Sequence, residues 1–278
     1  MKLTDRAKII GLTAFAALAA NVGLAFAADG PVDKGITLQP AASEVAHDIA
    51  WFHNAILMPV MVGISLLVLV LLVYVAIKFN EKANPKPATF THNVPLEIAW
   101  TAVPVLILIF IAIFSFPLLY KEDVTPANYD VTVKVTGNQW YWSYEYPDEE
   151  GLSLTANMLT AEEAKAQNKP FQFATDTAVV VPVNKTVRVQ VTASDVIHAW
   201  ALPAFGVKID AVPGTLNETW FKAERTGTFY GQCSEICGIR HAFMPIEIKV
   251  VTQAEYDAWI ASHKTASVAS PAQLAQAQ

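Results

Sequence analysis

Charged side chains are scarce in this chain, and two long stretches contain none. Only 16% of the 278 residues are Asp, Glu, Lys or Arg, whereas 53% are hydrophobic. No charged residue lies between Asp48 and Lys78, and none lies between Glu97 and Lys121. Each stretch exceeds the ~20 residues that cross the hydrocarbon core of a bilayer. The sequence therefore predicts two membrane-spanning helices, at about 49–79 and 95–120.

Basic residues are fewer than acidic ones. The chain has 19 Lys and Arg against 25 Asp and Glu, a formal net charge of −6. This charge gives no general attraction for nucleic acid, so no nucleic-acid partner is expected, but it suits a basic protein partner. Three lysines between the hydrophobic stretches, Lys78, Lys82 and Lys86, predict a cytoplasmic connector. The chain after Tyr120 then faces outward.

The first residues have the pattern of an export signal. Basic residues precede an uncharged run from Ile9 to Ala28, and Ala25-Phe26-Ala27 suits a signal peptidase. We expect residues 1–27 to be a removed signal peptide and residues 28–120 to form an N-terminal segment with the membrane hairpin. A retained anchor is the alternative, because the run approaches spanning length. In an oxidising compartment, two nearby cysteines form a disulfide unless a metal holds them as thiolates.

Long helical patterns give way to alternating polar and apolar residues after Tyr129. Short strands are predicted at 131–136, 140–146, 179–183, 186–192, 220–223, 227–230 and 245–251. So many strands without intervening helices predict a β-sandwich or barrel within 121–252. Residues 160–168 suit one or two helical turns. A capping box at Thr252–Glu255 opens a short helix to about Ser262, and residues 253–278 are expected to be this helix and a disordered tail.

Cysteine is nearly absent, and its two occurrences are close together. Cys233 and Cys237 are four residues apart, His241 follows four residues later, and Met244 comes three residues after that. Pro245 and two neighbouring glycines favour a loop between two strands. A loop allows these side chains to surround a metal ion.

Three explanations of this cluster remain open. A disulfide would use both cysteines but neither the histidine nor the methionine. Zinc normally uses C-x2-C spacing and does not favour a thioether. Copper accepts thiolate, imidazole and a weak axial methionine together. Two thiolates can bridge two copper ions if a second histidine joins them, and His198, at the end of a predicted strand, can supply it.

Four motifs resemble subunit II of the haem–copper cytochrome c oxidases of the copper-A type, bacterial and mitochondrial. They are Gln139-Trp-Tyr-Trp-Ser-Tyr-Glu-Tyr146, Asp195-Val-Ile-His198, Asp210-Ala-Val-Pro-Gly214 and Gly231-Gln-Cys-Ser-Glu-Ile-Cys-Gly-Ile-Arg-His-Ala-Phe-Met-Pro245. The resemblance covers nearly all of the chain after the predicted signal. It implies a two-helix transmembrane hairpin followed by an all-β cupredoxin-like Greek-key sandwich. It also implies a bacterial inner-membrane protein whose C-terminal domain is periplasmic.

The resemblance also implies an activity and partners. In this family a binuclear copper-A centre accepts single electrons from cytochrome c and passes them to haem in subunit I, which reduces oxygen to water in a proton-pumping enzyme. The implied copper ligands are His198, Cys233, the Glu235 carbonyl, Cys237, His241 and Met244. The Glu235 side chain would bind magnesium at the junction with subunit I, and subunit III is a further expected partner. The chain departs from many relatives at Arg240, where asparagine is frequent.

Other residues receive roles from the resemblance that compete with simpler interpretations. Trp140 would accept the electron from cytochrome c, although its segment alone reads as a half-buried aromatic strand. A group of acids would dock a lysine-rich cytochrome c, although such groups are usually only solvated. These acids are Glu145, Asp148, Glu149, Glu150 and Asp195.

Glu97 begins the second hydrophobic stretch. A carboxylate in the first turn of a helix is stabilised by the helix dipole, which is a sufficient structural explanation. The resemblance instead implies the mouth of a proton-uptake path into subunit I. An anchored copper carrier is a competing function for the whole chain, but a carrier needs a site that exchanges metal easily. A fused haem domain is excluded because Cys-x-x-Cys-His is missing.

Overall fold

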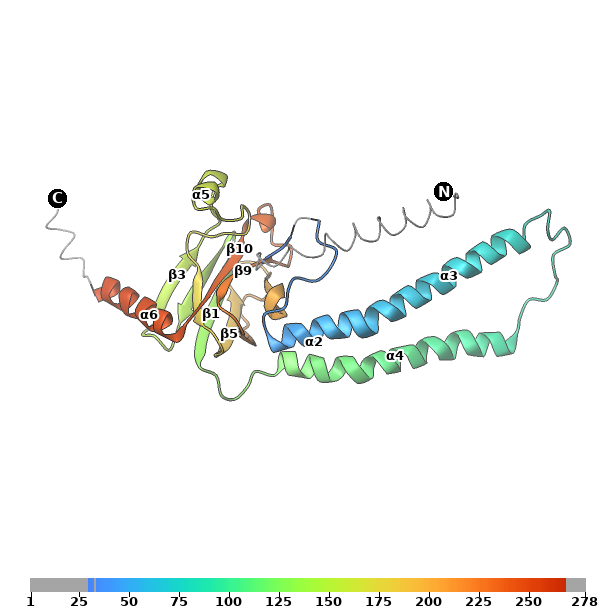
Figure 1. Cartoon of the computed structure of the whole chain (residues 1–278), viewed down its shortest axis with the longest axis horizontal. Helices are drawn as coiled ribbons and strands as arrows, with labels where there is room; N and C mark the ends of the chain where they lie inside the picture. Colours follow the sequence, from blue (N-terminus) through green and yellow to red (C-terminus); the bar gives the residue numbers. More distant parts are fainter. Residues whose placement is uncertain (1–29, 33, 269–278) are drawn as a thin grey trace, which may run out of the picture.

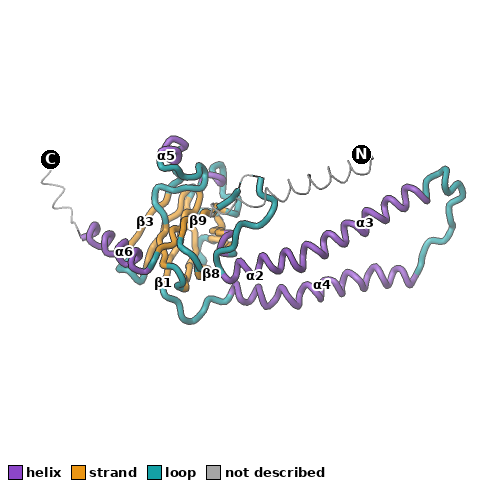
Figure 2. The backbone as a smooth tube through the Cα atoms, in the orientation of Figure 1, coloured by secondary structure: helices purple, strands orange, loops and turns teal. Residues whose placement is uncertain are grey.

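A computed structural model describes residues 30–32 and 34–268 of the chain. Two long helices form a hairpin that projects from a β-sandwich, as Figures 1 and 2 show. The predicted signal peptide, residues 1–27, and the last part of the predicted tail lie outside the described residues.

The hairpin follows from the two uncharged stretches. Its first arm runs through α2 (Glu44–Phe52), a π-helical turn (His53–Leu57) and α3 (Met58–Lys78), and its second arm is α4 (Val94–Asp123). Ser43 and Asn93 cap the two arms by accepting hydrogen bonds from backbone N–H groups of the first turn. Both arms are long and apolar enough to span a membrane, and their apolar side chains are exposed in the isolated chain. Lipid would cover such side chains.

Two five-stranded sheets form the sandwich. One has the order β3-β2-β1-β5-β8 and the other β4-β10-β9-β6-β7. The strands are β1 (Val131–Asn138), β2 (Tyr141–Tyr146), β3 (Leu152–Ala156), β4 (Val179–Pro182), β5 (Thr186–Ala193), β6 (His198–Leu202), β7 (Val207–Ala211), β8 (Asn217–Lys222), β9 (Gly227–Cys233) and β10 (Pro245–Val251). Large aromatic side chains, including Trp142, Trp200 and Phe205, fill the space between the sheets. The all-β sandwich was thus predicted correctly.

Three strands, β3, β6 and β7, were not predicted. Every residue of β6 is buried, so the strand has no alternation that the sequence could reveal. Because β6 was missed, His198 was wrongly placed at the end of a strand, whereas it is the first residue of β6. Gly231, expected to favour the loop, lies inside β9.

Two helices accompany the sandwich. The predicted helical turns at 160–168 correspond to α5 (Ala161–Ala166), which has a full capping box. The capping box of Thr252 and Glu255 opens α6 (Gln253–Val268). This helix continues past Ser262, where the sequence predicted its end, to Val268, because local propensities fix helix ends only weakly.

The hairpin is joined to the sandwich at two places. The Ala42 N–H donates to the Ala204 carbonyl at 2.7 Å, and the Ala42 carbonyl accepts from the Glu224 N–H at 3.0 Å. The Ser43 hydroxyl donates to the Phe205 carbonyl at 2.7 Å. At the end of α4, the Trp220 indole donates to the Lys121 carbonyl at 3.2 Å. These contacts set the position of the sandwich relative to the membrane arms.

Candidate metal centre

Neighbouring strands of one sheet bring the sulfur and nitrogen side chains together. β9 ends at Cys233 and β10 begins at Pro245, so residues 234–244 form a loop held at both ends by an antiparallel pair. β6 lies on the other side of β9, with Trp200 paired to Cys233. His198 at the start of β6 therefore faces this loop, although it is far from it in sequence.

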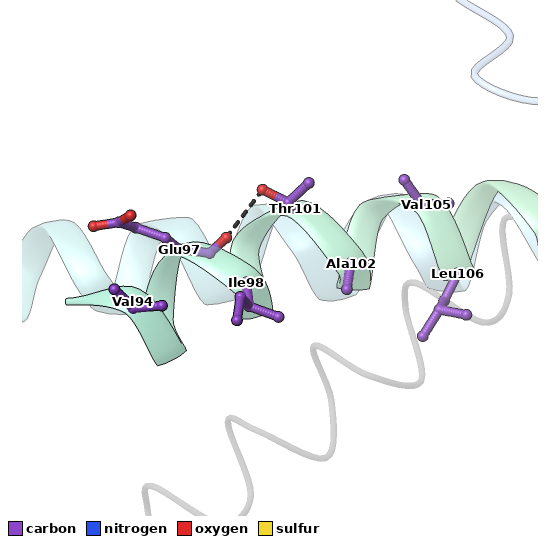
Figure 3. Close-up of a pocket in the computed structure, with 7 residues that line it drawn as sticks. All are labelled: Val94, Glu97, Ile98, Thr101, Ala102, Val105 and Leu106. Atoms are coloured by element: carbon purple, nitrogen blue, oxygen red, sulfur yellow. Dashed lines mark hydrogen bonds between the residues drawn. The ribbon is translucent and has the colours of Figure 1, made fainter.

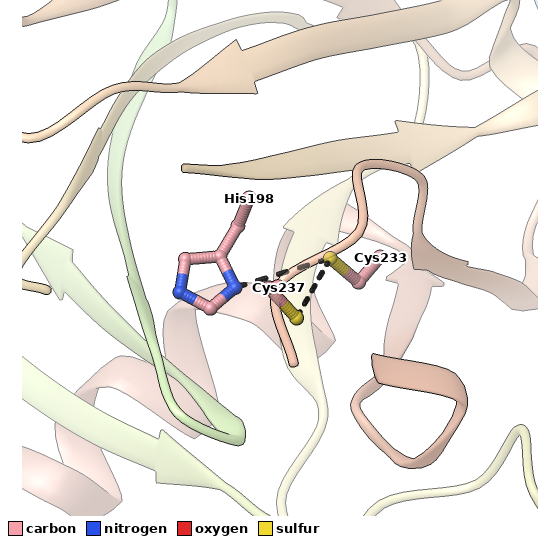
Figure 4. Close-up of side chains that lie close together, drawn as sticks. All are labelled: His198, Cys233 and Cys237. Carbon is pink, nitrogen blue, oxygen red and sulfur yellow. Dashed lines mark hydrogen bonds between the residues drawn. The ribbon is translucent and has the colours of Figure 1, made fainter. Parts of the chain in front are cut away.

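The donor atoms lie within a few ångströms of one another. The Cys233 and Cys237 sulfurs are 3.8 Å apart, too far for a disulfide bond, and both cysteines are free. Nδ1 of His198 lies 3.9 Å from the Cys233 sulfur, as Figure 4 shows. Nδ1 of His241 lies 3.7 Å from the Cys237 sulfur. The open alternative of a disulfide therefore does not describe this structure.

Two weaker donors complete the cluster. The Met244 sulfur lies 3.4 Å from the Cys237 sulfur, and the Glu235 carbonyl oxygen lies 3.4 Å from the Cys233 sulfur. Met244 and His198 are fully buried, and both cysteines are buried. The three sulfur atoms and the His198 ring thus lie in a region from which bulk water is largely excluded, whereas His241 is half-buried.

Asp195 orients His198. Its Oδ1 lies 2.9 Å from Nε2 of His198, and its Oδ2 accepts a hydrogen bond from the Gln139 backbone N–H at 2.7 Å. Burial opposes the charged forms of both groups, but their mutual interaction lowers the pKa of Asp195, and together with Cys233 it raises the pKa of His198. With Nε2 held by Asp195, Nδ1 is directed at the sulfur atoms. The sequence had assigned Asp195 only to docking.

The two thiols differ in acidity. Burial raises the pKa of Cys233, but its contacts with His198 and nearby backbone groups outweigh this effect and lower the pKa overall. Burial and the neighbouring Cys233 both raise the pKa of Cys237. A metal ion bound to both sulfurs would allow both cysteines to be thiolates at once, because the cation stabilises the deprotonated form of each.

This donor set fits copper. The cluster offers thiolate, imidazole and thioether donors together with a carbonyl oxygen. Copper accepts this combination, with the thioether and the carbonyl as weak donors, whereas zinc does not favour a thioether. Three of the donors, His198, Cys233 and Cys237, have ligand atoms within 4.8 Å of one another. The cluster is compatible with a copper site.

Trp140 lies against the ligand loop. Its indole N–H donates to the Cys237 carbonyl at 3.3 Å, and the Gln139 side chain donates to the same oxygen at 2.8 Å. A Cβ on Gly238 would lie 3.0 Å from the Trp140 ring, so glycine allows this close approach. The sequence did not predict the contact made by Gln139, although its position beside Trp140 was a possible signal.

The predicted docking acids are spread along β2, from the β1–β2 turn to the turn after β2. Asp195 lies beside the β1–β2 turn that carries Trp140. Glu145, on β2, forms an ion pair with Lys134 at 3.1 Å. The other three, Asp148, Glu149 and Glu150, follow the far end of β2. This strip of acids therefore spans the length of this strand.

Glu97 lines an open groove of about 550 Å³ at the start of α4, shown in Figure 3. Its Oε1 accepts a hydrogen bond from the Asn93 backbone N–H at 3.1 Å, and its carbonyl accepts one from the Thr101 hydroxyl at 2.9 Å. The first contact is a helix cap, which adds to the dipole stabilisation that the simpler interpretation invokes. Apart from Thr101, the other residues that line the groove are apolar, and Glu97 is the one ionisable residue among them.

The fold and the cluster define a class of protein, a cupredoxin-like domain with a donor cluster compatible with copper, on a two-helix membrane anchor. Residues 131–251 match the family described as cytochrome C oxidase subunit II, periplasmic domain, and residues 31–118 match its transmembrane domain. Cytochrome c oxidase subunit 2 of Cereibacter sphaeroides is 51% identical over 247 residues, which cover 83% of this chain and 80% of that one. The maize (Zea mays) protein of the same name is 42% identical, with coverage of 83% and 87%.

A solved structure, the periplasmic domain of subunit II of cytochrome oxidase of Bradyrhizobium japonicum, is 56% identical over 51% of this chain and 98% of that one, with a TM-score of 0.47. The chain belongs to the cytochrome c oxidase subunit 2 family, whose members are subunits of a terminal oxidase.

Proposed function

We propose that this chain is the electron-accepting subunit of a bacterial, proton-pumping cytochrome c oxidase and that its cluster holds two copper ions. Cys233 and Cys237 would bridge the ions, and His198 and His241 would each bind one. Met244 and the Glu235 carbonyl would be the weak donors. A copper pair bound there would take up and release one electron at a time with little change in bond lengths.

The protein's own contribution is to hold the donors still in a dry site. Asp195 fixes the orientation of His198, and the β9–β10 pair anchors both ends of the ligand loop. Trp140, partly buried on that loop, would be the point where cytochrome c makes contact and delivers its electron. Burial of the sulfur donors also favours an electron-transfer site over a copper carrier, because exchange requires access to the ligands.

Further parts of the proposal concern the partners. The Glu235 side chain is exposed beside the cluster, as it must be to bind magnesium at a junction with subunit I. Subunits I and III would surround the exposed membrane arms, in the inner membrane, with the sandwich in the periplasm and Glu97 on the cytoplasmic side. Haem in subunit I would then receive the electron and reduce oxygen.

The observation that carries this proposal is the group of five sulfur and nitrogen donors, with neighbouring distances of 3.4–3.9 Å. The test is copper analysis and electron spin resonance of the full chain in detergent. We expect two coppers per chain and one unpaired electron shared by two equivalent nuclei. Cys233→Ser should abolish this spectrum, because one thiolate cannot bridge both ions in the same geometry.

The matched control is Ser234→Ala, an exposed neighbour whose backbone N–H bond to the Ala199 carbonyl does not depend on its side chain. It should retain the spectrum. One copper per chain, or a spectrum from a single nucleus, would contradict the proposal.

A further inference from the structure

Trp142 belongs to one sheet of the sandwich, whereas the donor cluster lies on the other. It is part of β2, in the sheet β3-β2-β1-β5-β8, and the cluster is built on β6, β9 and the loop before β10, in the second sheet. Its side chain is completely buried. Across the β1–β2 ladder it is paired with Gly137, the residue that lies against the His198 ring. This pairing places Trp142 at the end of the sandwich where the donors gather.

The Trp142 side chain contacts two of the proposed copper ligands. Its indole N–H donates to the Met244 carbonyl at 3.2 Å, and its ring meets the His198 imidazole edge to face, with centroids 5.8 Å apart. The same Met244 carbonyl also accepts from the Cys233 N–H at 3.3 Å. The backbone of Met244 is thus bonded to both sheets, to β9 through Cys233 and to β2 through Trp142.

Met244 is the donor whose position depends most on such bonds. A methionine side chain is unbranched and flexible, so its backbone position and its neighbours decide where the sulfur lies. The sulfur of Met244 is buried and lies 3.4 Å from the Cys237 sulfur. In copper sites with a weak axial methionine, that donor tunes the redox potential. A contact that fixes Met244 therefore bears on the potential and not only on stability.

We infer that Trp142 is a positioning residue of the copper site, whose indole N–H holds the Met244 carbonyl and thereby fixes the methionine sulfur and the redox potential of the site. The inference rests on the proposed copper function of the cluster. Filling the core requires only an aromatic ring, which Phe205 and Phe221 supply elsewhere between the sheets. The indole N–H adds a directed bond, and in Trp142 this bond ends on the residue of a proposed ligand.

The direction of the effect follows from charge. The oxidised state of a copper site carries more positive charge than the reduced state, so it depends more on every electron-pair donor. When the Met244 sulfur is no longer held in place, the oxidised state loses more stabilisation than the reduced state. Loss of the Trp142 bond should therefore raise the midpoint potential.

The experiment compares two tryptophans that each donate to a backbone carbonyl. Trp142→Phe removes the bond to Met244 but keeps an aromatic ring beside His198. Trp220→Phe, the matched control, removes the bond from an indole to the Lys121 carbonyl at 3.2 Å, where α4 meets the sandwich. Full-length chains in detergent are loaded with copper, and their midpoint potentials, electron spin resonance spectra and thermal unfolding are measured. We expect a raised potential and an altered spectrum in Trp142→Phe, and neither change in Trp220→Phe.

A double-mutant cycle with Met244→Leu separates an effect through the methionine from a general loosening of the core. In the Met244→Leu background, Trp142→Phe should cause no further shift in potential, because the sulfur that Trp142 positions is absent. An unchanged or lowered potential in Trp142→Phe would overturn the inference. An equal shift with and without Met244 would overturn it as well.

A second variant removes the hydrogen bond without changing the volume of the side chain. If the smaller phenylalanine ring prevents folding, Trp142 alone is replaced by its benzothiophene analogue, in which sulfur takes the place of the N–H. The potential should rise as in Trp142→Phe, and an unchanged potential would overturn the inference. A normal two-copper spectrum of the unaltered chain with identical Trp142→Phe and Trp220→Phe variants would overturn this inference alone. Absence of that spectrum in the unaltered chain would overturn the proposed function together with it.

Discussion

His198 is held by contacts on several sides of its ring. Asp195 lies at Nε2, and the Trp142 ring meets the imidazole edge to face with centroids 5.8 Å apart. Gly137 of β1 covers the carbon side of the ring so closely that a Cβ there would lie 2.8 Å from Cδ2. Real side chains do not tolerate such a contact. Position 137 must therefore be glycine for His198 to reach the sulfurs.

Gly137→Ala should displace His198 and weaken the cluster. We expect a loss of about 1–3 kcal/mol in stability from overpacking, and a copper spectrum altered from that of the unaltered chain. Thermal unfolding and electron spin resonance of the copper-loaded chain measure the two effects. Gly63→Ala in α3 is the control, because a Cβ there meets nothing within 4 Å. An unchanged spectrum in Gly137→Ala would contradict this account.

At the scale of secondary-structure elements, the residues at the ends of the membrane helices join them to the sandwich. α2 begins at Ser43, whose hydroxyl accepts from the Ala46 N–H at 3.1 Å and donates to the Phe205 carbonyl at 2.7 Å. One buried side chain thus caps a membrane arm and joins it to the sandwich. A fragment that starts after α4 would lose this join, which is why the full chain is used in the copper experiment.

Ser43→Ala should destabilise the chain by about 1–2 kcal/mol, because it removes a helix cap and leaves a buried carbonyl with less hydrogen bonding. Thermal unfolding in detergent measures this, and the copper spectrum should be unchanged because the cluster is elsewhere. Thr37→Ala, which changes an exposed residue before α2, serves as the control. Equal stability of the two variants would show that the join is unimportant.

The start of α4 supports a prediction about proton uptake. Glu97→Gln keeps an oxygen acceptor for the Asn93 N–H, so the helix cap survives while the charge is lost. In the assembled oxidase we expect slower steady turnover, specifically in the reductive phase that is coupled to proton uptake. Cytochrome c binding and the copper spectrum should not change.

Glu81→Gln, in the exposed connector, is the matched control for Glu97→Gln. It removes an equal charge on the same side of the predicted membrane. If Glu97→Gln and Glu81→Gln both assemble and turn over normally, Glu97 acts only as a helix cap.

At the scale of the whole molecule, surface charge and interface size bear on how the chain would associate with cytochrome c. A protein interface of standard size buries ~800 Å² on each partner, enough to reach from Trp140 along β2 toward the turn that carries Asp148. Charges at such a surface act mainly on encounter, and salt screens them. The strip of acids and the buried cluster therefore have separable roles.

Neutralising Asp148, Glu149 and Glu150 together should slow association with cytochrome c and reduce its dependence on ionic strength. Trp140→Leu should leave association nearly unchanged and slow the electron-transfer step. Stopped-flow kinetics at several salt concentrations distinguish these effects. Glu162→Gln, which removes an exposed acid of α5, is the control. If both changes affected only stability, the docking assignment would be wrong.

The sequence predicted those parts of the fold that depend on local composition. Absence of charge identified the membrane arms, and alternation identified most of the sandwich. It could not identify β6, because a strand buried on both faces has no period. The end of α6 was also missed, since helix ends depend on weak propensities and on packing.

By itself, the sequence determined which residues can supply soft donors, because the spacing of Cys233, Cys237, His241 and Met244 lies within one loop. His198 was already the candidate for a second histidine, the family resemblance implied its role as a ligand, and the comparisons confirmed the family. Only the tertiary structure decided how these donors meet. The pairing of β6 with β9 brings His198 to Cys233, and Asp195 sets the direction of its ring.

A polar cavity of about 260 Å³ beneath α6, lined by Asp130, Asp148, Glu149 and Asp257, was likewise decided by tertiary structure. Its carboxylates come from the start of β1, the turn after β2 and α6, which are distant in sequence. Local patterns follow from the periods of helices and strands, which a sequence displays directly. Contacts between distant segments follow instead from how the sheets and helices pack, and packing exists only once the whole chain has folded.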